Sequence, residues 1–160
     1  MDNSPEHSRI ACSRLADWLQ LNSRALVSEW VVQVRQDAKV PSETLTNPEI
    51  IDHVPQILEE INEALRHACG TTPEVQQVTA RHTIVRWAQG YDLNAVIREV
   101  SLLRTVLILQ SRAFEQQYRE IGNEGLVFAS TIVNRILDDV VMDATDTFLK
   151  LKERAQGNES

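Results

Sequence analysis

Long stretches of this chain contain no residue that interrupts a helix. Glycine and proline contribute only five residues each to a chain of 160, and neither occurs over 91–121 or over 126–156. In both stretches apolar residues recur every three or four positions, as they do on one face of an α-helix. No segment shows the sustained two-residue alternation that is typical of strands. The sequence therefore predicts an all-α fold with two long helices at its C-terminal end.

The length fits one domain, and it is sufficient to bury a core without metal or disulfide support. We expect a disordered start over 1–7, a single helical domain over 8–154 and a polar tail over 155–160. Pro55 is expected to kink or restart the third helix, because proline lacks the backbone N–H that a helix interior needs. The predicted helices run over 8–21, 22–37, 47–69, 73–89, 93–120 and 126–154.

Several helix ends have recognisable signals in the sequence. Asn47, followed by Pro48, is expected to cap the third helix, and Thr72 before Pro73 has the same role in the fourth. These pairs combine a capping side chain with proline at the first helical position. Gly70 is expected to end the third helix, since glycine readily adopts the left-handed conformation found there.

Net charge, apolar run length and the first residues each exclude a class of protein. The net charge of −7 gives no basic surface for nucleic acid. No apolar run approaches the roughly 18 residues of a membrane-spanning helix. The first eight residues are polar and include Glu6, so they do not resemble a signal peptide. We expect a cytoplasmic protein in which Cys12 and Cys69 are reduced and pack as small side chains.

The helix predicted over 73–89 carries polar residues on its apolar face. Val75, Val78 and Val85 define this face, and on a 100° helical wheel His82 falls among them. Arg86 and Gln89 lie on the same side, at spacings of three and four residues. A side that is expected to pack inward therefore carries a histidine, an arginine and a glutamine.

The next helix also has charged residues close to its apolar stripe. Arg104 lies in the middle of that stripe and Glu99 lies at its edge. A buried arginine needs a partner, because an unpaired buried charge is very costly. Glu99 is the candidate partner for Arg86 or for Arg104, since arginine binds a carboxylate in bidentate fashion. Two interpretations stay open: a polar network that fixes helix packing, or a ligand pocket or switch.

No catalytic or metal-binding pattern is found. The sequence has no glycine-rich phosphate loop, GxSxG, HExxH or CxxC motif. The acidic residues of the last helix are expected to form a solvated face, because no other type of ligand accompanies them. The four histidines show no metal-site spacing among themselves. We therefore expect no cofactor, no metal site and no catalysis by this chain. The histidines are His7, His53, His67 and His82.

Two segments carry a resemblance to a known family. They follow the pattern H-x3-R-x2-Q-G-[FY]-x-L and then E-x4-R, and every position of the pattern matches. This arrangement resembles the N-terminal domain of RsbR/RsbRD-type stressosome co-antagonists, which also occurs in bacterial sensor histidine kinases. The opening with Trp18 and Trp30, and the segment 52–55, are similar to that family as well. The two segments are His82-Thr83-Ile84-Val85-Arg86-Trp87-Ala88-Gln89-Gly90-Tyr91-Asp92-Leu93 and Arg98-Glu99-Val100-Ser101-Leu102-Leu103-Arg104.

The resemblance implies a globin-like helical bundle that usually carries no haem. It also implies a homodimer that passes a signal through its last helix to a histidine kinase or to a stressosome-type regulatory output. In this interpretation the corner formed by Gly90, Tyr91 and Asp92 sets the angle between two helices, and Asp92 caps the second of them. A longer parent protein can then be a kinase while this chain is its input domain.

An alternative interpretation is a sensor that binds haem or another small ligand. His82 lies on the helix before the two long ones, where a globin places its proximal haem ligand. Haem requires an axial histidine and an apolar pocket. Arg86 and Gln89 share the face of His82, which favours a polar network over a haem site.

Overall fold

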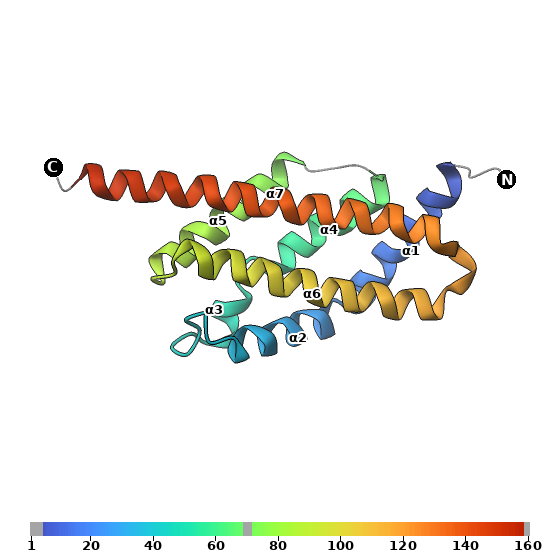
Figure 1. Ribbon diagram of the computed structural model, residues 1–160, viewed down its shortest axis with the longest axis horizontal. Coiled ribbons are helices and arrows are strands. Elements are labelled where there is room, and N and C mark those ends of the chain that lie inside the picture. The colour runs from blue at the N-terminus through green and yellow to red at the C-terminus, as the bar shows by residue number, and fades with distance from the viewer. Residues whose placement is uncertain (1–4, 69–71, 159–160) are drawn as a thin grey trace.

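The chain folds into α-helices, as the sequence predicts. The structure, a computed structural model, describes residues 5–68 and 72–158, and no strand occurs among them. The early helices are short and the last two are long (Figure 1). The helices are α1 (Pro5–Leu21), α2 (Ser23–Gln36), α3 (Asn47–Ile51), α4 (Val54–His67), α5 (Pro73–Ala88), α6 (Leu93–Gln117), the single 3-10 turn η1 (Arg119–Ile121) and α7 (Gly122–Gly157).

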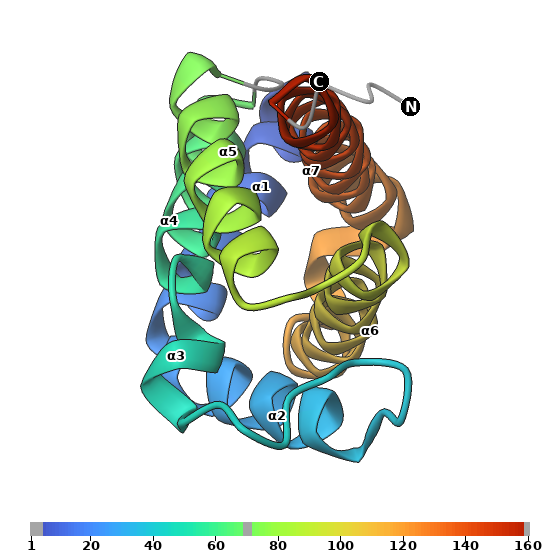
Figure 2. The ribbon, with the colours of Figure 1, turned by 90° about the vertical axis from the view of Figure 1, so that its left-hand side faces the viewer.

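The two long helices form an antiparallel pair. The chain reverses direction at η1, so that α7 returns alongside α6 (Figure 1). Viewed end-on, α5 and α4 lie on one side of the bundle and the long pair lies on the other, with α1 visible behind them (Figure 2). The helix α1 packs against both α4 and α7. The long helix α7 packs against α5, α1 and α6, whereas α6 packs against α7 and α2. Backbone contacts between α5 and α6 are few, so long side chains must span the space between these two helices.

Each early helix buries one apolar face in a common core. Trp30 of α2 is almost fully buried, and its indole Nε1 donates a hydrogen bond to the backbone oxygen of Glu99 at 3.1 Å. This bond ties α2 to α6 across the core. The spacing of three and four residues that predicted the helices also selects the buried positions. In α1 these are Ala11, Cys12, Leu15, Ala16 and Leu19, and in α4 they are Val54, Ile57, Leu58, Ile61, Ala64 and Leu65, with Asn62.

Several helix ends differ from the prediction. The first helix begins at Pro5 rather than at Ser8, so part of the segment that was expected to be disordered is helical. The last helix extends from Gly122 to Gly157, because Gly125 is tolerated inside it. Thr46, not Asn47, caps α3: its hydroxyl accepts from the backbone N–H of Glu49, whose carboxylate accepts from the backbone N–H of Thr46.

Among the other predicted features, the Asp92 cap and the burial of Cys12 are confirmed, whereas Thr72 precedes α5 but makes no side-chain capping hydrogen bond. The Asp92 side chain caps α6 by accepting from the backbone N–H of Ala95 at 2.8 Å. The thiol of Cys12 is buried, which raises its pKa to about 11. Cys69 and Gly70 lie outside the described residues. None of the described helices combines the length and apolar character needed to cross a membrane.

A close approach between α1 and α7 gives a first prediction. A Cβ added at Gly125 would lie 2.8 Å from the Cβ of Ala11, so the two helices would have to move apart. We expect Gly125→Ala to lower the free energy of unfolding by about 1–3 kcal/mol, as overpacking does. Chemical denaturation measures this change. Gly157→Ala is the control, because a Cβ there meets nothing within 4 Å; equal stability of the two variants would contradict the close approach.

Candidate functional site

Charged and polar side chains from separate parts of the chain meet inside the bundle. His82 and Arg86 lie one turn apart on α5, and Glu99 lies on α6. Their exposed fractions are 5%, 0% and 1%. Tyr91, from the corner between these helices, is 3% exposed. We refer to these four residues, together with Gln89 and Asp52, as the buried polar cluster.

The carboxylate of Glu99 is the centre of the cluster. Its Oε2 accepts from Nε of Arg86 at 2.8 Å and lies 3.2 Å from Nε2 of His82. Its Oε1 accepts from the hydroxyl of Tyr91 at 3.1 Å. Both oxygens of a fully buried carboxylate are therefore satisfied, which offsets the cost of removing the charge from water.

The guanidinium of Arg86 connects Glu99 to the end of α3. Its Nη2 donates to the backbone oxygen of Ile50 at 2.6 Å, and its Nη1 donates to that of Glu49 at 2.9 Å. Nη1 also donates to Oε1 of Gln89 at 2.9 Å. The ring of Tyr91 lies against the guanidinium, with its centroid 5.1 Å from Cζ. Arg86 thus joins α3, α5 and α6.

Asp52 completes the cluster from an unusual backbone position. Its φ and ψ of 41° and −117°, followed by −93° and 5° at His53, match a type II′ turn. The first central position of this turn favours glycine, so an aspartate there carries backbone strain. Its Oδ2 lies 2.9 Å from Nδ1 of His82 and 2.8 Å from Nδ1 of His53. The His53 nitrogen is buried and is not aligned for a hydrogen bond.

These contacts set the charges of the cluster. Burial favours the neutral form of Asp52, but the hydrogen bond from His82 and the proximity of His53 outweigh it and lower the pKa of Asp52 to about 2. Burial also disfavours the charged form of His82, yet hydrogen bonds to Asp52 and Glu99 raise its pKa above the usual value. Arg86 and the protonated form of His82 thus face the carboxylates of Asp52 and Glu99.

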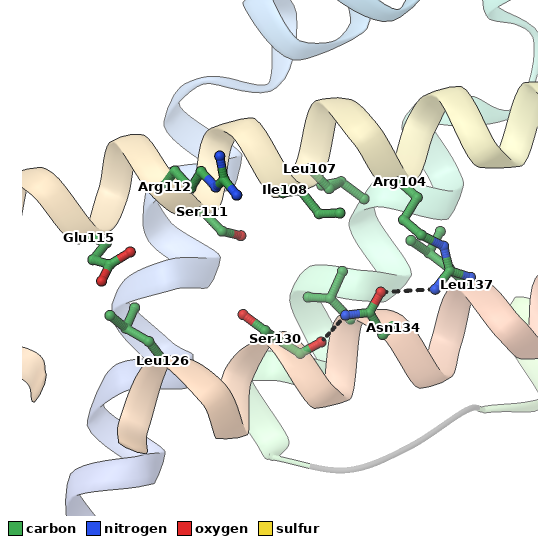
Figure 3. Close-up of a pocket in the computed structure, with 11 residues that line it drawn as sticks. Arg104, Leu107, Ile108, Ser111, Arg112, Glu115, Leu126, Ser130, Asn134 and Leu137 are labelled. Carbon is green, nitrogen blue, oxygen red and sulfur yellow. Dashed lines mark hydrogen bonds between the residues drawn. The ribbon is translucent and has the colours of Figure 1, made fainter. Parts of the chain in front are cut away.

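Arg104 does not belong to the cluster. It faces α7, where Nη1 donates to Oδ1 of Asn134 at 2.9 Å (Figure 3). Its Nη2 donates to Oδ1 of Asp138, also on α7, at 2.5 Å. Arg104 and Asn134 border a groove of about 200 Å³ between the two long helices. Arg104 is five positions beyond Glu99, which places it roughly 140° around the helix. The prediction that Arg104 shares a network with Glu99 is therefore wrong.

Comparison with known proteins identifies the family. The sequence model of the family described as the RsbT co-antagonist protein rsbRD N-terminal domain matches residues 24–160. The chain belongs to this family. The match includes every residue of the buried polar cluster, whereas α1 precedes it. No curated protein and no solved structure matches the chain.

The structure of this RsbRD-type domain brings most of the predicted site residues together. His82, Arg86, Gln89 and Glu99 are in contact, either directly or through one another. At the corner, Gly90 has a φ of 82°, a conformation that suits glycine, and this turn places Tyr91 on Glu99. Asp92 acts as a cap and stays outside the cluster.

Sequence reasoning missed two contributions. The first is Asp52, which lies 30 positions before His82 and so is not visible from helical spacing. The second is the pair of backbone oxygens at the end of α3, which no side-chain pattern can reveal. The segment 52–55 was noted as similar to the RsbRD family, and this was the available signal for Asp52.

One group of side chains within the described residues has the donor atoms of a metal site. Asp52, His53 and His82 each place one donor atom within 4.8 Å of the donors of the other two. From the sequence we expect no metal site, because the histidines lack the usual spacing along the chain. The turn at Asp52 brings His53 next to His82 in space, and their rings lie 6.5 Å apart.

Substitutions of Glu99 and Arg104 compare the contributions of a buried ion pair and a more exposed ion pair to stability. Glu99→Ala leaves Arg86 buried without its carboxylate, so we expect a loss of about 3–5 kcal/mol in the free energy of unfolding. Arg104→Ala removes a pair whose Asp138 partner is 65% exposed, and we expect a loss below about 1 kcal/mol. Denaturant titration compares the two variants. Similar losses would show that Glu99 is not the centre of the cluster.

Proposed function

We propose that this RsbRD-type domain is a non-catalytic input domain of bacterial signal transduction. In this proposal the buried polar cluster sets the packing of α3, α5 and α6, and α7 carries a change in that packing to an output. The output is a histidine kinase or a stressosome-type regulatory domain, and the protein acts in the cytoplasm. Membership of the family supports this proposal.

One aromatic contact links the helix of the buried polar cluster to α7. Trp87 follows Arg86 directly in sequence, and its ring packs edge-on against the ring of Phe148 with the centroids 4.8 Å apart. A shift of Arg86 relative to Glu99 therefore acts on α7 through the neighbouring residue of the same helix turn. Because α7 also packs along α5 over much of its length, it is well placed to respond.

The end of α7 supports a role in transmission. The helix has 36 residues, and its C-terminal end reaches beyond the other helices (Figure 1). Phe148 is the last buried residue, whereas residues 152–157 are all exposed. A helix that extends beyond the bundle can transmit its own rotation or shift to an attached domain.

We also propose a globin-like arrangement and a homodimer. The family resemblance supports both, and the surface of the long helices is consistent with association. Among the described residues, large apolar side chains are exposed on α6 and α7, where a partner can cover them. These side chains are Ile108, Leu109, Val127, Phe128, Met142 and Leu149.

A haem-binding role is not favoured by any contact in the cluster. Haem iron takes an axial histidine in an apolar pocket. Both ring nitrogens of His82 face carboxylates, and the guanidinium of Arg86 lies on the same carboxylate of Glu99. This environment suits a charged hydrogen-bond network better than a porphyrin.

A double-mutant cycle tests whether the cluster is coupled to α7. We expect Glu99→Gln and Phe148→Ala together to deviate from additivity in the free energy of unfolding by more than about 0.5 kcal/mol. The physical reason is that Arg86 and Trp87 are adjacent and each contacts one of the two residues.

Arg14→Ala provides the control cycle with Phe148→Ala. Arg14 pairs with Glu120 at the surface, far along the chain from Phe148. We expect this cycle to be additive within about 0.3–0.5 kcal/mol. If the Glu99 cycle is equally additive, the cluster is not coupled to α7 and the proposed relay fails.

Size-exclusion chromatography with light scattering tests the homodimer. We expect a mass of twice the 18.2 kDa of one chain, because association covers the exposed apolar side chains of the long helices. An absorbance spectrum of the same peak, after incubation with haem, is expected to show no Soret band. A monomer at every concentration would contradict the dimer, and a Soret band lost in His82→Ala would restore the haem interpretation.

A further inference from the structure

We propose that Asp52, His53 and His82 form a binding site for a divalent transition metal, with Zn²⁺ as the best match to their chemistry. The site offers two imidazole nitrogens and one carboxylate oxygen, the ligand types that zinc takes in proteins. This inference goes beyond the signalling role and does not depend on it, since a metal can bind whether or not α7 transmits a signal.

The three donor atoms lie within 4.8 Å of one another. Oδ2 of Asp52 lies 2.8 Å from Nδ1 of His53 and 2.9 Å from Nδ1 of His82. Ligands of a tetrahedral zinc ion, at about 2.0–2.1 Å from the metal, are about 3.3 Å from one another. The two distances must therefore widen by roughly half an ångström, which rotation of the His53 and Asp52 side chains can supply.

His53 gives an independent reason to expect a ligand. Its Nδ1 is buried but has no hydrogen-bond partner, although a carboxylate oxygen lies 2.8 Å away. A buried polar atom without a partner is costly and rare in folded proteins. A metal ion held jointly by this nitrogen and by Oδ2 of Asp52 gives the nitrogen a partner and keeps the carboxylate paired.

The backbone conformation of Asp52 also supports a binding site here. An aspartate at a φ of 41° occupies a turn position that favours glycine. Strained conformations of this kind cluster at binding and catalytic sites, where the surrounding structure maintains them. Here the turn is what places the carboxylate between two histidines that are 29 positions apart in the sequence.

His82 is already oriented as a metal ligand. Histidine ligands of metals usually donate the N–H of their other nitrogen to a carboxylate, which fixes the ring and its tautomer. Nε2 of His82 lies 3.2 Å from Glu99, and Glu99 is held in turn by Arg86 and Tyr91. Metal binding then releases the Nδ1 proton to solvent, while the Nε2 proton stays on His82 and is donated in a hydrogen bond to Glu99. The buried polar cluster thus supplies the outer shell of the site.

The site is open to solvent on one side. His53 and Asp52 have side-chain exposures of 26% and 14%, whereas His82 is 6% exposed. A metal ion can enter past His53 and reach His82. Three protein ligands leave one position of a tetrahedral ion for water or another small ligand, as in open zinc sites.

Metal titration of the full chain tests the proposal. After treatment with a chelator, the chain is titrated with ZnCl₂ by calorimetry and with CoCl₂ by visible absorption. We expect one Zn²⁺ per chain and cobalt bands of tetrahedral type. His53→Ala and Asp52→Asn are each expected to weaken binding at least 10-fold, since even outer-shell changes have effects of 10–100-fold.

His67→Ala is the matched control. His67 is an exposed histidine beside Glu63 on α4, a pair that can bind metal weakly at any helix surface. We expect this variant to bind Zn²⁺ as the wild-type chain does. Binding that is unchanged in His53→Ala, that disappears in His67→Ala, or that never saturates would overturn the proposal.

A second measurement covers the case in which a variant does not fold, as judged by circular dichroism. Imidazole ¹⁵N NMR of the wild-type chain, with and without Zn²⁺, reports which ring nitrogens bind the metal. We expect Nδ1 of His53 and of His82 to shift, while His7 and His67 stay unchanged. Shifts at His7 or His67 alone would show that the metal binds elsewhere.

Discussion

The arrangement of this domain depends on one buried carboxylate. Glu99 has almost no contact with solvent, and its two carboxylate oxygens are hydrogen-bonded to the side chains of Arg86, His82 and Tyr91. The helices α5 and α6 make few backbone contacts, so these long polar side chains define how the two helices are held relative to each other. An apolar core of similar volume would permit many small sliding movements. Directed hydrogen bonds to one carboxylate permit few such movements. A change in this cluster is therefore expected to alter helix packing as a whole.

Helical periodicity was sufficient to predict the fold class and most of the cluster. The spacing of His82, Arg86 and Gln89 placed all three on one side of α5, and the structure confirms this. Periodicity failed where partners come from a loop or from the backbone. Asp52 reaches the cluster through a turn at positive φ, and Arg86 binds carbonyl oxygens that every sequence possesses. Neither contribution leaves a pattern at the spacing of a helix.

Arg104 shows the limit of assigning the partner of a side chain from a helical wheel. Arg104 and Glu99 both lie near the apolar stripe of α6, yet α6 packs on two sides, and each side has its own polar partners. The wheel identifies an inward-facing residue but not the neighbour that it meets. That neighbour depends on tertiary contacts between helices, here Asp138 on α7 for Arg104. On a helix that is buried on two faces, such as α6, a helical wheel therefore does not identify the partner of a polar residue.

The hydrogen bonds from Arg86 to the backbone of α3 have a consequence for the order of folding. A helix of five residues is too short to persist alone, and the last carbonyl groups of any helix lack partners within it. The guanidinium supplies two of those partners from a position 36 and 37 residues further along the chain. The end of α3 is thus completed only when α5 has docked. A chain that has emerged only as far as α4 therefore lacks both of these donors, and the end of α3 gains them when α5 docks.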